Sequence, residues 1–401
     1  MRQRRLRRGF LLVIFIAALF VSGCWDRREL NELSIAVGMG LDLSESGIEV
    51  TAQVVNPGEV VARGGSTGYS TPVTTLSAID KTTFEALRKL NTLAPRKIYT
   101  SHLRVLVIGE RLARHGLNDV LDGVSRDREF RSDFYLIVAK GTTAKNVLSI
   151  LTPMEKIPAN KMFITLGQSH KYWAPTVKVQ LDDFMSDEAN PVKSMVLTGL
   201  EVVGNSEKGR TKRNESRSTP YALLNYSGVG LFKGGKLVDW LGEEESKGYN
   251  YIMDNVYNTA GHISCPGGKE LGVEVIRAKA TKKGKVEGGR PEITVRLFVE
   301  ENISEVRCKI DLTKQQNIVL LEQLGEDKLE GILMSVIRKA QANKADIFGF
   351  GEAVEDANPR AWKAMEDKWP EYFAKLDVKV EVDVQIRKLG TTSNSILERG
   401  E

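Results

Sequence analysis

The segment Leu103-Arg104-Val105-Leu106-Val107-Ile108 sets the architecture of the first half of the chain. A short run that is apolar at nearly every position is typical of a strand with both faces buried. Helical patterns flank it at residues 82–93 and 109–115, and a second strand and helix follow at residues 134–139 and 142–151. Strands and helices that alternate in this way predict an α/β or α+β domain in which helices pack on a sheet.

Strands dominate the second half. The turn Lys233-Gly234-Gly235 separates two apolar runs and predicts a tight hairpin. A second hairpin is expected from residues 270–281 and 292–300, followed by one or two amphipathic helices within residues 315–343. Residues 376–386 alternate strictly between apolar and polar side chains, as in a strand with one buried and one wet face. The predicted fold class is α+β, multi-domain, with mixed β-sheets and packed helices.

A polar stretch divides the two halves. Residues 204–220 contain no large apolar side chain, and such a composition cannot bury enough surface to order itself. We therefore expect a polar linker or a long loop there. It separates an N-terminal α/β region of one or two lobes at residues 24–203 from a C-terminal domain at residues 221–390. Residues 391–401 are expected to be a disordered tail.

The N-terminus carries an export signal that precedes the α+β body. Five arginines are followed by an apolar run over residues 10–21, shorter than the ~20 residues of a transmembrane helix. This arrangement is typical of a secretory signal peptide. Val21-Ser22-Gly23-Cys24 resembles a bacterial lipobox. That resemblance implies a lipoprotein signal peptide at residues 1–23, cleavage before Cys24, and a diacylglyceryl group on its thiol with an N-acyl chain such as palmitate.

The residue after the lipobox is suited to a membrane surface. Trp25 would lie at the lipid–water boundary, where its amphipathic ring is stable. The alternative to lipidation is an uncleaved signal anchor in which Cys24 is incidental.

The mature chain is close to neutral. The full sequence has 57 basic and 52 acidic residues, a net charge of +5, but residues 1–23 hold five arginines and no acid. A nucleic-acid-binding domain or a polybasic membrane patch would need basic residues on the folded body itself. We therefore expect no nucleic-acid partner, and membrane attachment through the lipid on Cys24.

Two further cysteines leave an open choice. Cys265 and Cys308 lack zinc-type spacing and form no Cys-x-x-Cys pair. They could form a disulfide across a long loop, which depends on geometry. Of the two outcomes, we expect two buried thiols.

No catalytic set is apparent in the sequence. Gly38-Met39-Gly40 and Gly349-Phe350-Gly351 have too few glycines for a nucleotide-binding loop, and no Gly-x-Ser-x-Gly elbow occurs. We predict a protein that is not an enzyme and has no cofactor or metal. The four histidines stand alone, without metal-binding spacing, at His102, His115, His170 and His262.

A group of polar side chains near the strand at residues 103–108 has two interpretations. It could form a buried ion network or partner surface, or it could consist of scattered surface pairs, each contributing under about 1 kcal/mol. We favour the second interpretation. The seven residues are Arg96, His102, Glu110, Arg126, Asp127, Glu129 and Arg131.

Five stretches, taken in order, resemble one family. They are Gly23–Leu33; Pro95–Tyr99 with His102 and Val107–Ala113; Gly228–Lys233 with Lys236-Leu237 and Trp240-Leu241; Asp346–Glu352 with Trp362; and Ile386–Gly390. Together they resemble the GerAC-type C subunits of spore germinant receptors, the Ger(x)C lipoproteins, over almost the whole chain. The resemblance implies a three-domain α/β arrangement with mixed sheets.

The resemblance also implies a function. It implies a lipoprotein on the outer face of the spore inner membrane that assembles with membrane-embedded A and B subunits. The complex would respond to small nutrients and start germination, and this subunit would be non-catalytic. Two other functions stay open: the substrate-binding lipoprotein of a solute uptake system, which would have two similar lobes, and an anchored cell-wall hydrolase, which would need a nucleophile, a carboxylate pair or a metal.

Overall fold

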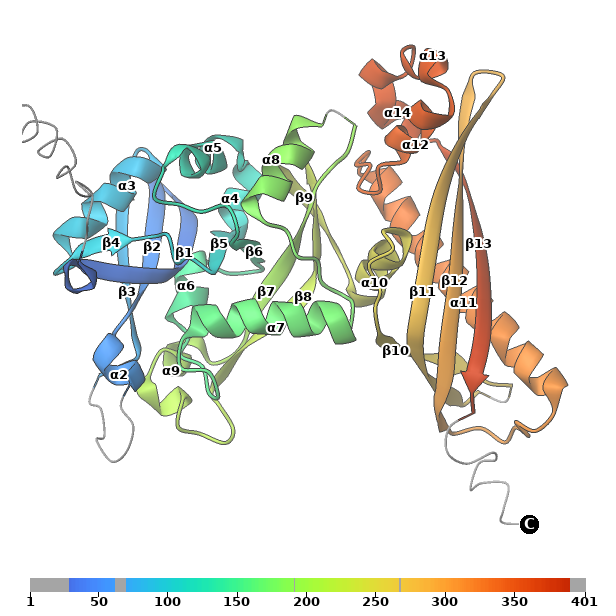
Figure 1. Ribbon diagram of the computed structural model, residues 1–401, viewed down its shortest axis with the longest axis horizontal. Coiled ribbons are helices and arrows are strands. Elements are labelled where there is room, and N and C mark those ends of the chain that lie inside the picture. Colours follow the sequence, from blue (N-terminus) through green and yellow to red (C-terminus); the bar gives the residue numbers. More distant parts are fainter. Residues whose placement is uncertain (1–28, 62–69, 191, 267, 390–401) are drawn as a thin grey trace, which may run out of the picture.

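The computed structural model builds two β-sheets, each packed against helices (Figure 1). Both sheets contain parallel and antiparallel pairs, so the predicted α+β class with mixed sheets is confirmed. The predicted signal peptide at residues 1–23, Cys24, Trp25 and the predicted tail at residues 391–401 lie outside the described residues. The structure describes residues 29–61, 70–190, 192–266 and 268–389.

The first sheet has nine strands. Its order is β3-β2-β1-β5-β6-β7-β8-β9, with β4 paired on β1. Strands β1, β5, β6 and β7 run parallel, and antiparallel strands flank them on both sides. The strands are β1 Leu33–Ser44, β2 Gly47–Val55, β3 Val73–Asp80, β4 Lys97–Tyr99, β5 Val105–Gly109, β6 Tyr135–Ala139, β7 Val196–Gly204, β8 Ala222–Lys233 and β9 Lys236–Leu241.

Helices cover both faces of this sheet, as β5 requires. Leu106 and Ile108 lie in a core with α3, α4, α5 and α8, whereas Val105 and Val107 lie in a core with α6 and α7. The predicted strand with two buried faces is therefore confirmed. The helical segments of this half are η1 Leu30–Glu32, α2 Pro57–Val61, α3 Thr83–Lys89, η2 Leu90–Thr92, α4 Glu110–His115, α5 Asn118–Arg126, α6 Ala144–Ser149, α7 Pro158–Tyr172, α8 Leu181–Ala189, α9 Ser206–Gly209, η3 Lys212–Asn214 and α10 Glu243–Ile252.

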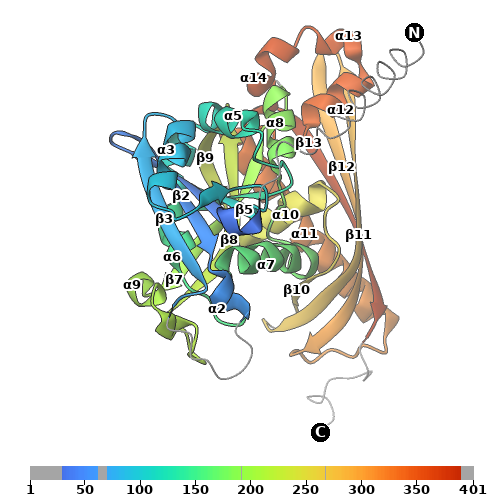
Figure 2. The same cartoon turned by 60° about the vertical axis from the view of Figure 1, so that its left-hand side comes forward.

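The second sheet has four strands, in the order β10-β11-β12-β13. The β11–β12 hairpin closes at Gly288-Gly289, both in the left-handed region of φ, so part of the turn expected at residues 282–290 is strand. Helix α11 crosses one face, and α12 to α14 gather near the hairpin turn (Figures 1 and 2). The elements are β10 Thr259–Ser264, β11 Glu270–Glu287, β12 Arg290–Val306, α11 Gln315–Ala342, α12 Phe350–Ala357, α13 Pro359–Trp362, η4 Glu366–Lys368, α14 Trp369–Phe373 and β13 Asp377–Lys388.

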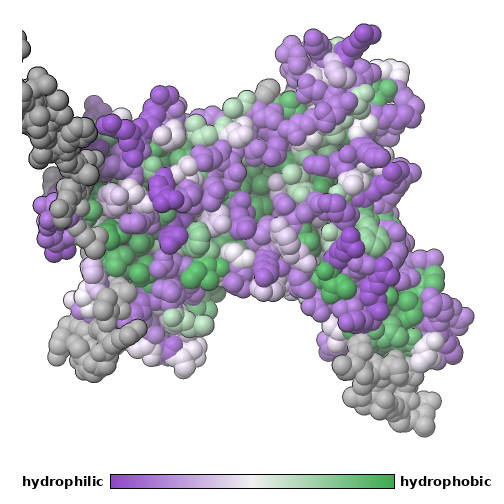
Figure 3. Space-filling view, viewed as in Figure 1, coloured by the Kyte–Doolittle hydropathy of each residue, from purple (hydrophilic) through white to green (hydrophobic). Residues whose placement is uncertain are grey.

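The two halves share one hydrophobic core, while the face of the molecule in Figure 3 is largely hydrophilic with separate apolar patches. Helix α10 lies between the sheets in both ribbon views. Its Tyr249 belongs to the same buried cluster as Leu231 and Leu241 of the first sheet and Val295 and Val336 of the second half. The sheets differ in strand number and order, so the two similar lobes expected of a solute-binding lipoprotein are not found in the described residues.

Residues 204–220 form the long connection between β7 and β8 and contain α9 and η3. The fully buried Asn214 orders it: its Nδ2 donates to the carbonyl of Leu151 at 2.6 Å, and its Oδ1 accepts from the Tyr221 amide at 2.8 Å. The stretch is thus an ordered connection within the first sheet, and the expectation that its polar composition cannot order itself is wrong. Because β8 pairs with β7, the chain passes to the second sheet after α10 rather than at this loop.

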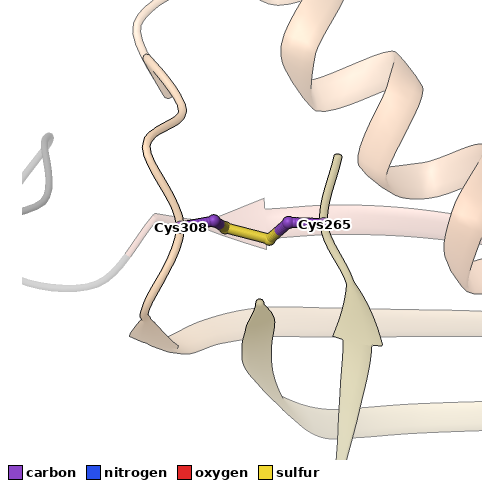
Figure 4. The surroundings of a disulfide bond; sticks show 2 residues. All are labelled: Cys265 and Cys308. Carbon is purple, nitrogen blue, oxygen red and sulfur yellow. A yellow bond between two sulfur atoms is a disulfide. The ribbon is translucent and has the colours of Figure 1, made fainter. Parts of the chain in front are cut away.

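Cys265 and Cys308 form a disulfide (Figure 4), so the expectation of two buried thiols is wrong. The two residues are 43 positions apart, but the antiparallel pairing of β11 with β12 brings the segments beyond their ends together. Their Cα atoms lie 6.3 Å apart, within the range that a disulfide spans. The sequence could not supply this information, because the register of the hairpin decides the separation.

Candidate functional site

The polar group predicted around β5 is not a single network in the described residues. The ion pairs of these side chains run to residues outside the group, as expected for scattered pairs that each contribute under about 1 kcal/mol. The favoured interpretation is confirmed for the pairs Arg126–Asp122 and Arg131–Asp133, which are exposed on both sides. In the pairs Arg88–Asp127, Lys97–Glu129 and Arg114–Glu110 the carboxylate is largely buried.

Glu110 joins two of the family-like stretches. Its Oε1 accepts from the Trp240 indole at 3.1 Å, and its Oε2 accepts from the Gly141 amide at 2.6 Å. Partial burial raises the pKa of Glu110, but these hydrogen bonds and one from Arg114 outweigh it and lower that pKa below its ordinary value. This carboxylate is fully engaged in holding α4 against β9.

Asp346 is a second structural carboxylate. It is buried and accepts from the amides of Phe348 (3.2 Å), Phe350 (3.1 Å) and Gly351 (2.8 Å) and from the Trp369 indole (2.9 Å). Burial raises the pKa of Asp346, and the four hydrogen bonds, which lower it, offset this increase only in part. Because four donors bind one carboxylate, the Asp346 side chain fixes the backbone conformation of the Asp346–Glu352 stretch between α11 and α12.

A cavity of about 260 Å³ lies between helices α10 and α11 and strands β10 to β12, and we call it the α10–α11 cavity. This volume is just below the ~300–1,000 Å³ of typical small-molecule sites. Ile263, Val273 and Ile332 line it with apolar groups. In this cavity, apolar walls meet a buried charged group that has no hydrogen bond from the described residues.

Glu301 of β12 supplies that charged group. Its side chain is 3% exposed, and its Oε1 makes no hydrogen bond with any described residue. Burial, and secondarily the negative charge of Glu322, raise the pKa of Glu301 to about 7. Gly325 of α11 leaves space beside it, since a Cβ there would stand 3.7 Å from Oε1. The carboxyl therefore faces the cavity without a partner from the chain.

Two lysines that line the cavity interact with other side chains. The Lys247 ammonium lies 3.4 Å from the centre of the Trp173 ring and donates to the Ala260 carbonyl at 3.3 Å. Burial lowers the pKa of Lys247. The Lys328 Nζ lies 3.0 Å from Nε2 of His262. Neither ammonium is paired with Glu301 among the ion pairs of the described residues.

This cavity was not predicted from the sequence, although the sequence carries one signal of it. Along β12 every second residue is apolar until Glu301 takes the place of an apolar side chain between Val299 and Ile303. An acid on the buried face of a strand marks a position of special chemistry. The cavity itself depends on contacts between α10, α11 and the sheet, which are far apart in sequence.

Two general features of the described residues bear on the class of site. No three His, Cys, Asp or Glu side chains gather there as a metal ion would require. In the same part of the chain, no helix is long and apolar enough to span a bilayer. The predicted lipidation residue Cys24 and its neighbour Trp25 lie outside it.

Comparison with known proteins identifies relatives over nearly the whole chain. A model for the spore germination protein N-terminal domain matches residues 26–202, and one for the spore germination B3/GerAC-like C-terminal domain matches residues 227–390. Spore germination protein KC of Bacillus subtilis (strain 168) is 32% identical over 97% of this chain and 98% of its own. Spore germination protein B3 of the same organism is 25% identical over 94% and 97%.

A solved structure supports the same assignment at the level of the fold. The crystal structure of the GerBC protein matches with a TM-score of 0.56 and 20% identity, covering 90% of this chain and 99% of that one. The resemblance seen in the five sequence stretches is confirmed by these relatives. The chain therefore belongs to the GerAC-like family of spore germination proteins.

Proposed function

We propose that this protein is the membrane-anchored C subunit of a nutrient germinant receptor and acts without catalysis. It assembles with the membrane-embedded A and B subunits on the outer face of the spore inner membrane. The observation that carries the proposal is the match to spore germination protein KC from end to end, in a chain whose Cys24 follows Val21-Ser22-Gly23.

In this proposal, the lipid on Cys24 attaches the protein to the membrane. Each buried CH₂ contributes about 0.8 kcal/mol, and two acyl chains hold a protein on a bilayer where one does not. Tethering at Cys24 raises the effective concentration of the folded body near embedded partners, so that modest contacts are enough for assembly. The near-neutral mature chain leaves attachment to the lipid rather than to basic residues.

The disulfide supports an exported location. Disulfides persist in oxidising compartments and are rare in the bacterial cytosol. The Cys265–Cys308 bond is therefore expected of a domain that folds outside the cytosol.

Replacement of the anchor residue tests the proposal. We expect Cys24→Ala to leave the folded body intact, to remove the diacylglyceryl mass from the mature N-terminus, and to abolish the response of spores to the nutrient. Mass spectrometry of the N-terminal peptide and a germination assay measure both effects. Ser22→Ala, which keeps a small residue before the cleavage point, is the matched control and should germinate normally. Normal germination of the Cys24→Ala strain with every nutrient would contradict the anchoring role.

A further inference from the structure

The α10–α11 cavity contains a carboxylate that the folded chain does not satisfy. Glu301 is only 3% exposed, and its Oε1 has no hydrogen-bond donor among the described residues. Buried polar atoms are normally paired, because an unpaired buried charge is strongly destabilising. A group that stays unpaired at the wall of a cavity indicates a partner that comes from outside the chain.

The partner that fits Glu301 is a cation. A carboxylate accepts hydrogen bonds but does not donate them, and the neighbouring charge that shifts the pKa of Glu301, that of Glu322, is also negative. The nearby lysines cannot serve, since Lys247 lies on the Trp173 ring and Lys328 on His262. A divalent metal is a poor fit: Glu243 and Glu244 also line the cavity, but no three His, Cys, Asp or Glu side chains of the described residues gather as such an ion would require.

The remaining walls define the rest of the ligand. Ile263, Val273 and Ile332 present apolar surface, and Gly325 opens space next to the carboxyl. A volume of about 260 Å³ accepts a small organic molecule rather than a peptide. Apolar walls with a small number of polar and charged groups are the usual composition of a site for a small amphipathic ligand.

We infer that the α10–α11 cavity binds a small organic ammonium ion, whose nitrogen pairs with Glu301 and whose apolar body lies against Ile263, Val273 and Ile332. The charged donor makes a hydrogen bond roughly twice as strong as a neutral one. The inference is independent of the anchoring proposal, because every residue that it uses lies between positions 173 and 332.

Matched probes test the charge requirement. Isoamylamine and phenethylamine are titrated by calorimetry into the full mature chain in detergent micelles at about pH 8, where Glu301 is largely ionised. Isoamyl alcohol and 2-phenylethanol are the neutral counterparts, and protein-free micelles are the blank. We expect each amine to bind at least about tenfold more tightly than its alcohol. Equal affinities, or no amine binding, would overturn the inference.

Three variants locate the binding. Glu301→Gln keeps the shape of the side chain and should weaken amine binding about tenfold or more. Gly325→Ala keeps the carboxylate but narrows the space beside it; its Cβ would make ordinary contacts of 3.4 Å with Ile263 and Val384, so it should fold and bind amines less tightly. Glu300→Gln, the neighbouring acid on the opposite face of β12, is the control and should bind like the parent. Amine affinity that is unchanged in folded Glu301→Gln contradicts the site, as does equal weakening in Glu300→Gln.

Discussion

Glu300 and Glu301 are neighbours on β12 whose carboxylates meet opposite environments. Glu300 lies on the outer face of the second sheet, where the Arg387 Nε donates to it at 2.7 Å and Arg277 lies 3.6 Å away. Glu301 lies on the inner face and has neither a cation nor a donor from the described chain. Since strand side chains alternate between faces, one position along the chain separates a paired charge from an unpaired one.

Burial alone does not mark such a residue, as Asp346 demonstrates. Asp346 is about as buried as Glu301, but backbone amides and the Trp369 indole donate to it. Those donors make Asp346 part of the scaffold between α11 and α12. The difference between a structural acid and a candidate ligand group is therefore the number of donors that the fold supplies, which the sequence does not reveal.

We predict that Glu301→Gln stabilises the protein at alkaline pH and has little effect at acidic pH. The folded state raises the pKa of this carboxyl from 4.5 to about 7, so the unfolded state loses its proton first as pH rises. Stability of the parent then falls between about pH 4.5 and pH 7, by about 3 kcal/mol in total, and stays low above that window. The glutamine variant has no such loss.

Urea unfolding from pH 4.5 to pH 8 checks this prediction. The difference in unfolding free energy between variant and parent should grow from near zero to about 3 kcal/mol. A difference that does not change with pH would mean that Glu301 titrates normally. A saturating amine ligand should reduce the difference at high pH, because binding stabilises the charged parent.

Some helices could be predicted from the sequence, and others could not. Thr82 and Thr143 cap α3 and α6, and both helices were expected in those places. The segment at residues 156–191 has weak periodicity, and its helices α7 and α8 were not predicted. Their signals are local: Pro158 in the first turn of α7, and the capping box of Gln180 with Asp183 in α8.

The length of the β11–β12 hairpin was underestimated for a different reason. The Lys- and Gly-rich residues 282–287 look like a turn, but the pairing continues to Glu287 and Arg290. Helix α12 packs directly on this end of β11, where a Cβ on Gly284 would stand 2.1 Å from the Ala353 carbonyl oxygen. A contact between segments some 70 residues apart thus fixes the strand, and no local pattern encodes it.

The disulfide ties the end of β10 to the segment after β12. A loop closed over 43 positions contributes about 4 kcal/mol in the chain-entropy model. We predict that Cys265→Ala and Cys308→Ala each lower the free energy of unfolding by about 2–4 kcal/mol. The double variant should lose about as much as either single variant, because all three lack the same bond. Urea unfolding of the oxidised proteins measures these values. Additive losses would show that packing of the sulfur atoms, rather than the bond, carries the effect.

At the scale of the whole molecule, the two halves are joined by packing as well as by the chain. The family models meet near the β7–β8 loop, yet β8 and β9 complete the first sheet, and α10 then packs on α11 of the second half. The Asn250 Nδ2 donates to the carbonyls of Ala174 (2.7 Å) and Thr176 (3.1 Å). The shared core could not be predicted from the sequence, since periodicity tells which side chains are buried but not against which element.

A shared core predicts that the mature protein unfolds as one unit. Calorimetry of the mature chain should give a single transition whose calorimetric and van't Hoff enthalpies agree. Asn250→Ala removes the donor to the Ala174 carbonyl and one of the two partners of the Thr176 carbonyl, which also lies 3.0 Å from Nδ1 of His170. It should therefore cost about 1–3 kcal/mol and lower that transition by a few degrees without splitting it. Arg126→Gln, which removes only an exposed pair with Asp122, should leave the transition temperature unchanged. Two separate transitions in the parent would contradict a common core, because α10 would then release one sheet before the other.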